Sequence, residues 1–202
     1  MFITFEGCDG AGKTTQVNLL REFFLRALPA KEVVIFREPG GTAVGERVRD
    51  IIIDKNLASM SPISELFLYA AARAQIVSEK IRPALALGKI VICDRFTHST
   101  IAYQHFGRGI PREIIDDINA YATGGLSPEI TFFLDIPPKE ALRRLAARNG
   151  EPDRMELENA AFHQKVYNGY KELAKKDDKI LTIDALRDCD KVFEDIINRK
   201  LG

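Results

Sequence analysis

The eight residues from Gly7 to Thr14, GCDGAGKT, have the types and spacing needed to hold the phosphates of a nucleotide. They fit the pattern G-x-x-x-x-G-K-[ST] and stand between a strand-like segment and a helix-like one, the context that this pattern requires. The glycines let backbone N–H groups point inward, and a helix start adds partial positive charge. We expect Lys13 to reach the β- and γ-phosphates and Thr14 to offer its hydroxyl to Mg²⁺. The residues expected to contact ATP here are Gly7, Cys8, Asp9, Gly10, Ala11, Gly12, Lys13, Thr14 and Thr15.

Nucleotide binding leaves three classes of protein open: a small-molecule kinase, a GTPase switch, and an ATPase coupled to motion or assembly. A switch GTPase should carry an NKxD-type guanine reader, and no such tetrapeptide occurs. A motor or assembly ATPase usually has a longer chain than these 202 residues. A small kinase fits best, and such an enzyme must close over both substrates to exclude water.

Two further apolar segments end in charged residues. Ile90–Cys93 is followed by Asp94 and Arg95, and Val33–Phe36 by Arg37 and Glu38. In open α/β sheets ligands bind at the carboxyl ends of strands, so Asp94 should face Mg²⁺, directly or through water, and Arg95 the transferring phosphates. Two plainer interpretations stay open: a salt bridge between Asp94 and Arg95, and a simple turn with a helix cap after Arg37 and Glu38.

Composition sets limits on the class of protein. The length predicts one domain spanning 1–202, and 46% hydrophobic residues are typical of a globular chain. Equal numbers of basic and acidic residues, 29 each, argue against nucleic acid as a partner. The 3 scattered cysteines indicate a reducing compartment. No basic leader and no apolar run of about 18 residues is present, so we expect a cytoplasmic protein without a membrane partner.

Short β-rich segments alternate with segments of helical periodicity. The expected strands are 2–5, 33–36, 90–93, 130–134 and 180–183, mostly apolar on both faces. The pattern predicts an α/β fold, a five-stranded parallel sheet with helices on both faces. Residues 143–154, RRLAARNGEPDR, carry four arginines, and we call them the lid segment. They are interpreted as a helix end followed by a mobile loop; a solvated charged helix is the alternative.

Four motifs occur in order along the chain: FEGCDGAGKTTQ, REPGGT, DRFTHSTIAYQHFGRG and DRME. Together they closely resemble the thymidylate kinases, and the similarity runs from Phe2 to the C-terminal helix. The resemblance implies a P-loop NTPase-type fold, the reaction ATP + dTMP → ADP + dTDP in dTTP synthesis, Mg²⁺ as cofactor and a homodimer. Another nucleoside-monophosphate or deoxynucleoside kinase is the alternative, and an ATP-binding regulatory module without turnover is a distant one.

The resemblance also implies roles for individual residues. Asp9 would contact the 3′-hydroxyl of dTMP, and Tyr69 would stack on thymine while Arg73 donates to a carbonyl. Spacing supports this pair, because positions i and i+4 share one helix face, although Tyr69 in the core with Arg73 exposed is the plainer interpretation. The residues expected to bind dTMP are Asp9, Arg37, Glu38, Arg49, Tyr69, Arg73, Arg95, Ser99, Thr100, Tyr103 and Gln104.

The resemblance is to the type, common in bacteria, that has glycine at position 10 and takes its catalytic arginine from the lid. The expected catalytic residues are therefore Asp9, Lys13, Arg95, Arg148 and Arg154, with Arg143 on the adenine face. Three positions depart from the family's commonest pattern: Tyr69 replaces Phe, Phe96 replaces Tyr, and Thr100 replaces Ser or Asn.

Cys8 allows two opposite predictions. Near Lys13 and a helix start, an accessible thiol would have a lowered pKa and react with alkylating agents. A side chain that fills space, or points into the core of the sheet, would be inert.

Overall fold

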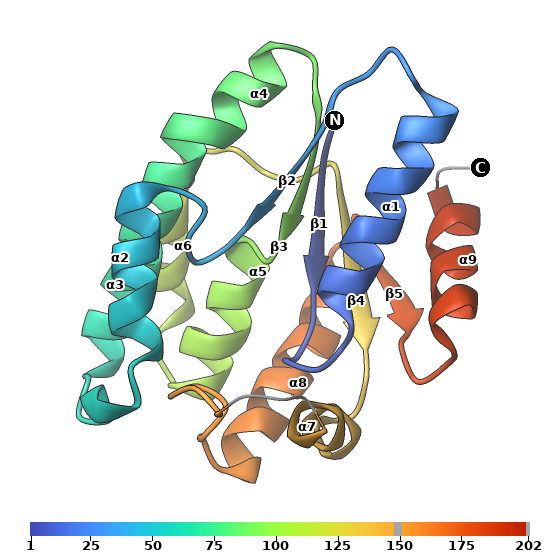
Figure 1. The fold of residues 1–202 in the computed structure, drawn as a ribbon. Coiled ribbons are helices and arrows are strands. Elements are labelled where there is room, and N and C mark those ends of the chain that lie inside the picture. The colour runs from blue at the N-terminus through green and yellow to red at the C-terminus, as the bar shows by residue number, and fades with distance from the viewer. Residues whose placement is uncertain (148–150, 201–202) are drawn as a thin grey trace.

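Five parallel strands form the centre of the fold. The computed structural model describes residues 1–147 and 151–200 of the chain, Lys200 by its backbone alone. The strands lie in the order β2-β3-β1-β4-β5, so β1 is central. Figure 1 shows every arrowhead pointing to the same edge of the sheet. The predicted fold class and all five predicted strands are confirmed; the strands are β1 Phe2–Glu6, β2 Val33–Arg37, β3 Ile90–Asp94, β4 Ile130–Asp135 and β5 Ile180–Asp184.

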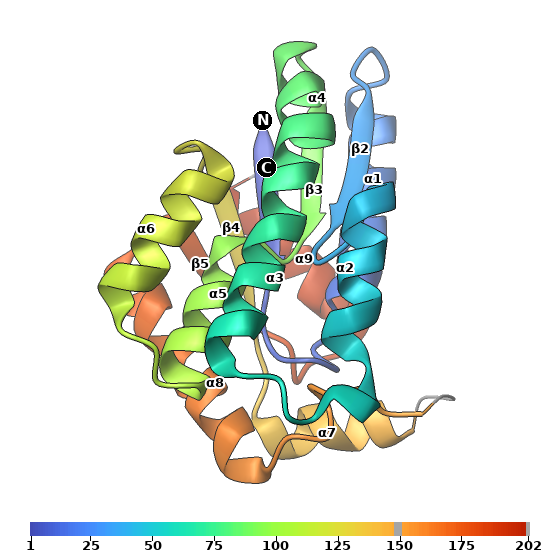
Figure 2. The same ribbon diagram turned by 90° about the vertical axis from the view of Figure 1, so that its left-hand side faces the viewer.

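Helices cover both faces of the sheet (Figures 1 and 2). The first face carries α1 Lys13–Ala27 and α9 Cys189–Lys200. The second face carries α3 Pro62–Ile76, α4 Arg82–Ala86, α5 Thr97–Thr100 and α8 Ala160–Lys176. The remaining helices are α2 Ala43–Ile53 and α6 Arg112–Thr123, packed on α3, and α7 Pro138–Ala146, beyond the carboxyl ends of the strands. Short segments complete the list: a 3₁₀ turn at Lys55–Leu57 and π-helical turns at Val77–Ile81 and Ile101–Gly107.

The side chains of the central strand β1 are buried on both faces of the sheet. Ile3 and Phe5 face the core under α1 and α9, whereas Phe2 packs in the core under α3 and α4. Successive side chains of a strand point to opposite faces, so a strand buried on both faces must be apolar at nearly every position. Among the described residues, no helix is long and apolar enough to cross a membrane.

Helix starts place several side chains at the edge where the strands end. Thr42 caps α2 by accepting a hydrogen bond from the Gly45 N–H, and Ser61 caps α3 from Ser64 N–H. Helix α1 follows Gly12, which is left-handed (φ 89°) and has no side chain that could cap the helix. The first N–H groups of α1 are therefore left for a ligand.

Candidate active site

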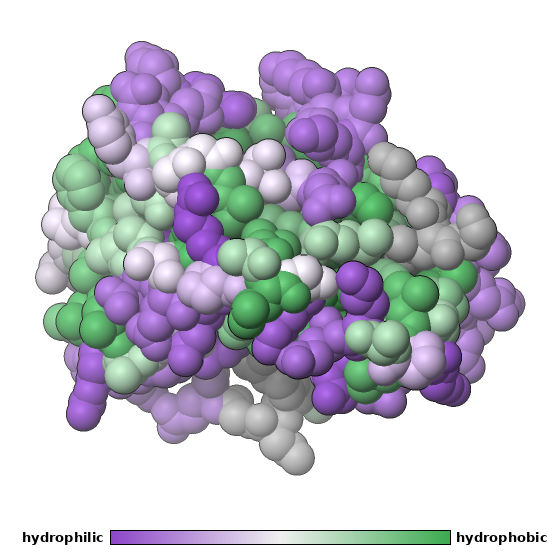
Figure 3. Space-filling view, turned by 90° about the horizontal axis from the view of Figure 1, so that it is seen from above, coloured by the Kyte–Doolittle hydropathy of each residue, from purple (hydrophilic) through white to green (hydrophobic). Residues whose placement is uncertain are grey.

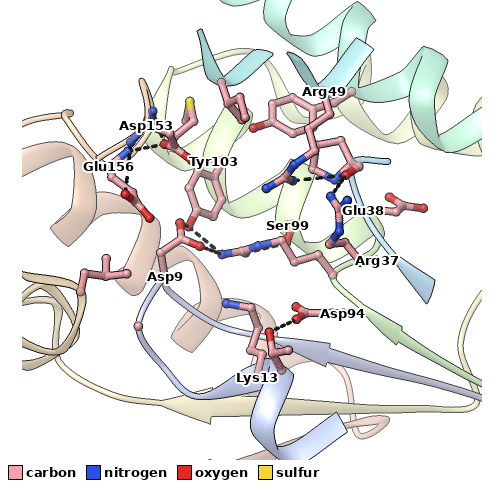
Figure 4. Close-up of a pocket in the computed structure, with 18 of the residues that line it drawn as sticks. Asp9, Lys13, Arg37, Glu38, Arg49, Asp94, Ser99, Tyr103, Asp153 and Glu156 are labelled. Atoms are coloured by element: carbon pink, nitrogen blue, oxygen red, sulfur yellow. Dashed lines mark hydrogen bonds and ion pairs between the residues drawn. The ribbon is translucent and has the colours of Figure 1, made fainter. Parts of the chain in front are cut away.

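A cavity of about 550 Å³ opens at the carboxyl ends of β1, β2 and β3 (Figure 4). Most of the predicted site residues line it. They are Asp9, Gly10, Gly12, Lys13, Thr14, Thr15, Arg37, Glu38, Arg49, Tyr69, Asp94, Arg95, Ser99, Thr100, Tyr103 and Gln104. Predicted residues outside this lining are Gly7, Cys8, Ala11, Arg73, Arg143 and Arg154. Arg148, a predicted catalytic residue, lies outside the described part of the chain.

Lys13 points across the mouth of the phosphate-binding loop. Its Nζ donates to the carbonyl oxygens of Gly7 at 3.1 Å and Cys8 at 2.9 Å. Burial, and after it the nearby Arg95 cation, lower the pKa of Lys13. A phosphate entering the loop would offer this ammonium a charged partner in place of two neutral carbonyls.

Gly10 is where the loop meets the helix that begins the lid segment. Its φ is +84°, and a Cβ built there would lie 2.3 Å from the carbonyl oxygen of Ala141 in α7. A carbon atom and an oxygen atom that are not bonded to each other cannot approach so closely. Helix α7 can therefore lie against the loop only because residue 10 has no side chain.

The Cys8 side chain points into the sheet core, where it is 5% exposed. Burial raises the pKa of its thiol to about 11. The prediction of an accessible, acidified Cys8 is therefore wrong for this structure, and the inert alternative holds. The nearby cations Lys13 and Arg95, which would lower this pKa, are outweighed because a thiolate in an apolar core loses its hydration.

Thr14 and Asp94 lie side by side at the loop. The Thr14 hydroxyl donates to Asp94 Oδ2 at 2.9 Å, and both side chains line the cavity (Figure 4). A hydroxyl and a carboxylate are the oxygen donors that Mg²⁺ prefers. The plainer interpretation, a salt bridge between Asp94 and Arg95, is wrong, because Arg95 pairs with another acid.

Arg95 is instead paired with Asp9. Its Nη2 lies 2.6 Å from Asp9 Oδ1, and Tyr103 donates to the other Asp9 oxygen at 2.9 Å (Figure 4). Burial alone would raise the pKa of Asp9, but the charges of Arg95 and Lys13 hold it well below its usual range. Arg95 also has a left-handed backbone (φ 72°), an unusual conformation for a residue with a side chain. Such a conformation persists where surrounding contacts hold it.

Those contacts lead to Glu6, a buried carboxylate that sequence reasoning missed as a site residue. Glu6 accepts hydrogen bonds from the backbone N–H groups of Phe96 at 2.8 Å and Ser99 at 3.2 Å. It also accepts from the hydroxyls of Ser99 at 2.6 Å and Tyr170 at 3.0 Å, the two groups to which Arg95 Nη1 donates. An acid that ends a mostly apolar central strand was the signal that could have found it.

Two arginines converge beside the Gly-Gly turn. Arg37 and Arg49 each donate an Nη1 hydrogen bond to the Pro39 carbonyl, at 2.8 and 3.2 Å, and Arg37 is paired with Glu46 at 2.8 Å. Burial, and then the Arg37 charge, lower the pKa of Arg49. Two cations so close together favour an anion between them. Sequence reasoning did not identify Glu46 as a residue of this site.

Tyr69 and Arg73 share one face of α3, yet they lie at different depths. Tyr69 lines the cavity, whereas Arg73 is 2% exposed beneath it. The plainer interpretation, with Arg73 exposed, is wrong. The Arg73 guanidinium donates to Glu38 at 2.7 Å, Thr100 at 2.6 Å, Asn119 at 2.9 Å and the Phe96 carbonyl at 2.9 Å. Its expected bond to a base would require part of this buried network to rearrange.

The lid arginines take three different positions. Arg143 is largely exposed and paired with Glu140 at 2.7 Å, away from the cavity lining. Arg154 is buried, with Nη1 2.7 Å from Glu65 Oε2 and Nε donating to the Ile52 carbonyl. Arg144, which was not among the expected site residues, lines the cavity. Among the described arginines of the lid segment, Arg144 is thus the one at the cavity.

Comparison with known proteins gives the same picture. The thymidylate kinase family model matches residues 5–196. The thymidylate kinase of Thermoanaerobacter sp. (strain X514) is 47% identical over 198 residues, which is 98% of this chain and 95% of the relative. That of Kosmotoga olearia is 44% identical over 202 residues, 100% of this chain and 95% of the relative. The crystal structure of thymidylate kinase from Ehrlichia chaffeensis superposes with a TM-score of 0.79 at 37% identity, over 98% of this chain and 96% of that one. The chain therefore belongs to the thymidylate kinase family.

Proposed function

We propose that the cavity at the strand ends is the site where the γ-phosphoryl group of ATP passes to the 5′-phosphate of dTMP. As a thymidylate kinase, the chain phosphorylates dTMP to dTDP in dTTP synthesis. One observation carries the assignment of the site: the phosphate-binding loop, a pair of arginines and an aromatic face line a single cavity. Such a cavity suits two nucleotides that meet at their phosphates.

The donor side would be the loop and the start of α1. Backbone N–H groups from Gly7 to Thr15 surround the phosphates of ATP, and Lys13 lies beside the γ-phosphate. The oxygens of Thr14 and Asp94 suit a Mg²⁺ ion, held directly or through water. Bound there, the ion would neutralise phosphate charge.

The acceptor side would be the opposite wall. Arg37 and Arg49 hold the dTMP phosphate between two cations, which orients it toward the donor. Asp9 accepts a hydrogen bond from the 3′-hydroxyl, and Tyr69 stacks on the base. The side chains expected to surround the base and sugar are Glu38, Arg73, Ser99, Thr100, Tyr103 and Gln104.

Transfer of a phosphoryl group asks for positioned positive charge more than for covalent chemistry. Arg95 supplies this charge between the two phosphates. Its position is fixed by its ion pair with Asp9 and by its hydrogen bonds to the hydroxyls of Ser99 and Tyr170, which in turn donate to Glu6. We propose that Arg144 adds a further charge from the lid segment, because it lines the cavity. Arg148 and Arg154 stay candidates, Arg154 only if it leaves Glu65. Arg143 stays a candidate for the adenine face, and one domain spanning 1–202 stays a prediction.

A homodimer is the second part of the proposal. Apolar side chains stand exposed on the adjacent helices α2, α3 and α6: Val44, Ile51, Ile63, Phe67 and Ile114. Figure 2 looks onto these helices, and Figure 3, seen from above, shows hydrophobic residues among hydrophilic ones at the left-hand edge, the side on which Figure 1 draws these helices. Phe67, 58% exposed, is the largest of them, and burying it against a second copy would remove apolar surface from water.

Sedimentation velocity tests the dimer. Phe67→Glu should sediment as a monomer, because a charge would be buried at the interface. Leu87→Glu, an equally drastic change at a side chain that is 73% exposed beyond α4, is the control and should leave the dimer intact. A Phe67→Glu protein that stays dimeric contradicts the assigned face.

A coupled ADP-release assay across dTMP, dUMP, CMP, AMP and GMP tests the function. We expect dTMP to give the highest kcat/KM, and Arg49→Ala to raise the KM for dTMP at least about tenfold with little change for ATP. ADP release that is greater with another monophosphate would indicate a different nucleotide kinase. No release with any of them would indicate a regulatory ATP-binding module.

A further inference from the structure

Glu65 is a buried carboxylate that none of the roles described so far uses. It lies on α3 four residues before Tyr69 and eight before Arg73, so these three residues follow one face of the helix. Its side chain is 1% exposed. It lies behind the cavity lining, where it is bonded to Gln104, a residue that lines the cavity.

Both side-chain oxygens of Glu65 face N–H groups of described residues, and in each contact Glu65 is the acceptor. Oε1 accepts from Gln104 Nε2 at 2.9 Å and from Arg108 Nε at 3.0 Å. Oε2 accepts from Arg108 Nη2 at 2.9 Å and lies 2.7 Å from Arg154 Nη1. Although burial alone would raise it, these donors hold the pKa of Glu65 below its usual value. The group is therefore an ionised carboxylate, which only accepts hydrogen bonds.

This carboxylate decides which way the Gln104 amide points. Gln104 is 1% exposed, lines the cavity, and can present either its NH₂ or its carbonyl oxygen to Glu65. A flipped amide would bring its oxygen to within 2.9 Å of a carboxylate oxygen, two acceptors in contact in a buried place. The NH₂ group must therefore face Glu65, and the carbonyl oxygen is left for the ligand.

We infer that Glu65 is a positioning residue for base selection: by holding the NH₂ group of Gln104, it presents a hydrogen-bond acceptor to the base. The inference rests on the proposed function, in which this cavity binds a pyrimidine nucleotide. Thymine and uracil carry an N3–H donor that matches the acceptor. Cytosine has an unprotonated N3, itself an acceptor, so the same oxygen repels it. The contact thus separates dTMP and dUMP from dCMP, and it does not separate dTMP from dUMP.

The test uses Glu65→Gln, which leaves size nearly unchanged and removes the acceptor-only character. A neutral amide at 65 can pair with Gln104 in either orientation. We expect the ratio of kcat/KM for dTMP to that for dCMP to fall about 10- to 100-fold, mainly through KM. The ratio of dTMP to dUMP should stay within about twofold, which separates an inverted amide from a generally loosened pocket.

Two controls assign the effect. Glu158→Gln removes another ion pair of the same Arg108, with its Oε1 2.6 Å from Nη1, but does not touch Gln104, so the dTMP to dCMP ratio should not move. In a Gln104→Leu background, adding Glu65→Gln should leave the ratio unchanged, because Glu65 acts through that amide. An unchanged ratio in Glu65→Gln, or an equal fall in both backgrounds, overturns the inference.

Wild-type protein offers a test that does not depend on the folding of a variant. N3-methyl-dTMP keeps both carbonyls of thymine but lacks the donor, and its KM should exceed that of dTMP at least about tenfold. Equal KM values would overturn the inference. Absence of ADP release with dTMP itself would instead contradict the proposed function.

Discussion

Replacing Gly10 by alanine should disrupt the contact between the phosphate-binding loop and helix α7. The new Cβ would lie 2.3 Å from the Ala141 carbonyl oxygen and 3.0 Å from its carbonyl carbon. Both are backbone atoms of α7, so no side-chain rotation relieves the overlap. Either α7 moves away, or the loop leaves the conformation in which its N–H groups point inward.

Two terms set the expected loss of stability. A left-handed φ of +84° costs a residue with a Cβ about 1–2 kcal/mol. Forcing a methyl group into a filled space costs about 1–3 kcal/mol more. The free energy of unfolding of Gly10→Ala should therefore fall by about 2–5 kcal/mol.

Gly88→Ala is the matched control. Gly88 is also left-handed (φ +71°), but a Cβ there meets no described atom within 4 Å, and it lies in the turn before β3, at the other end of the sheet from the cavity. It should show only the backbone term, about 1–2 kcal/mol, with normal turnover. Urea denaturation of both variants at 25 °C measures the difference, and steady-state kinetics should show a lowered kcat for Gly10→Ala alone. Equal losses in the two variants would refute the reasoning, since α7 would then yield freely.

Three further outcomes are expected. Arg95→Ala should lower kcat about 10²–10³-fold with a much smaller change in the KM for ATP, because it removes positioned charge; steady-state kinetics in which only KM moves would contradict this. Because the pKa of Asp9 is depressed on folding, its ionised form stabilises the fold above about pH 4, and that contribution is lost as the pH falls further. In a plot of the urea midpoint against pH, Asp9→Asn should therefore show a smaller fall at acid pH than the wild-type protein does. Alkylation of native protein at neutral pH, read by mass, should modify exposed Cys189 and spare buried Cys8 and Cys93 with or without ATP; labelled Cys8 would contradict its burial.

Much of the site could be predicted because its chemistry is local in the chain. The loop from Gly7 to Thr14 carries its own donors, and its strand and helix are neighbours in sequence. Asp94 and Arg37 could be brought to the same edge without a structure, since parallel strands end together. The cavity lining confirms that this edge gathers them.

The lid and the base wall could not be predicted in the same way. Four arginines in the lid segment have equal charge, and the sequence does not say which will meet an acid far along the chain. Arg154 forms a buried ion pair with Glu65, whereas Arg144 lines the cavity. Glu65 itself could have been noticed only as the position four residues before Tyr69.

The sequence by itself determined the sheet, the phosphate-binding loop and the identity of the residues at the strand ends, because apolar periodicity and short motifs act within a few residues. Only the tertiary structure decided where side chains point and what they meet. Cys8 turns into the core, Arg73 lies beneath the pocket, and Gly10 must be bare because α7 packs on it. These outcomes depend on elements distant in the chain, whose packing sets both the burial and the partner of each polar group.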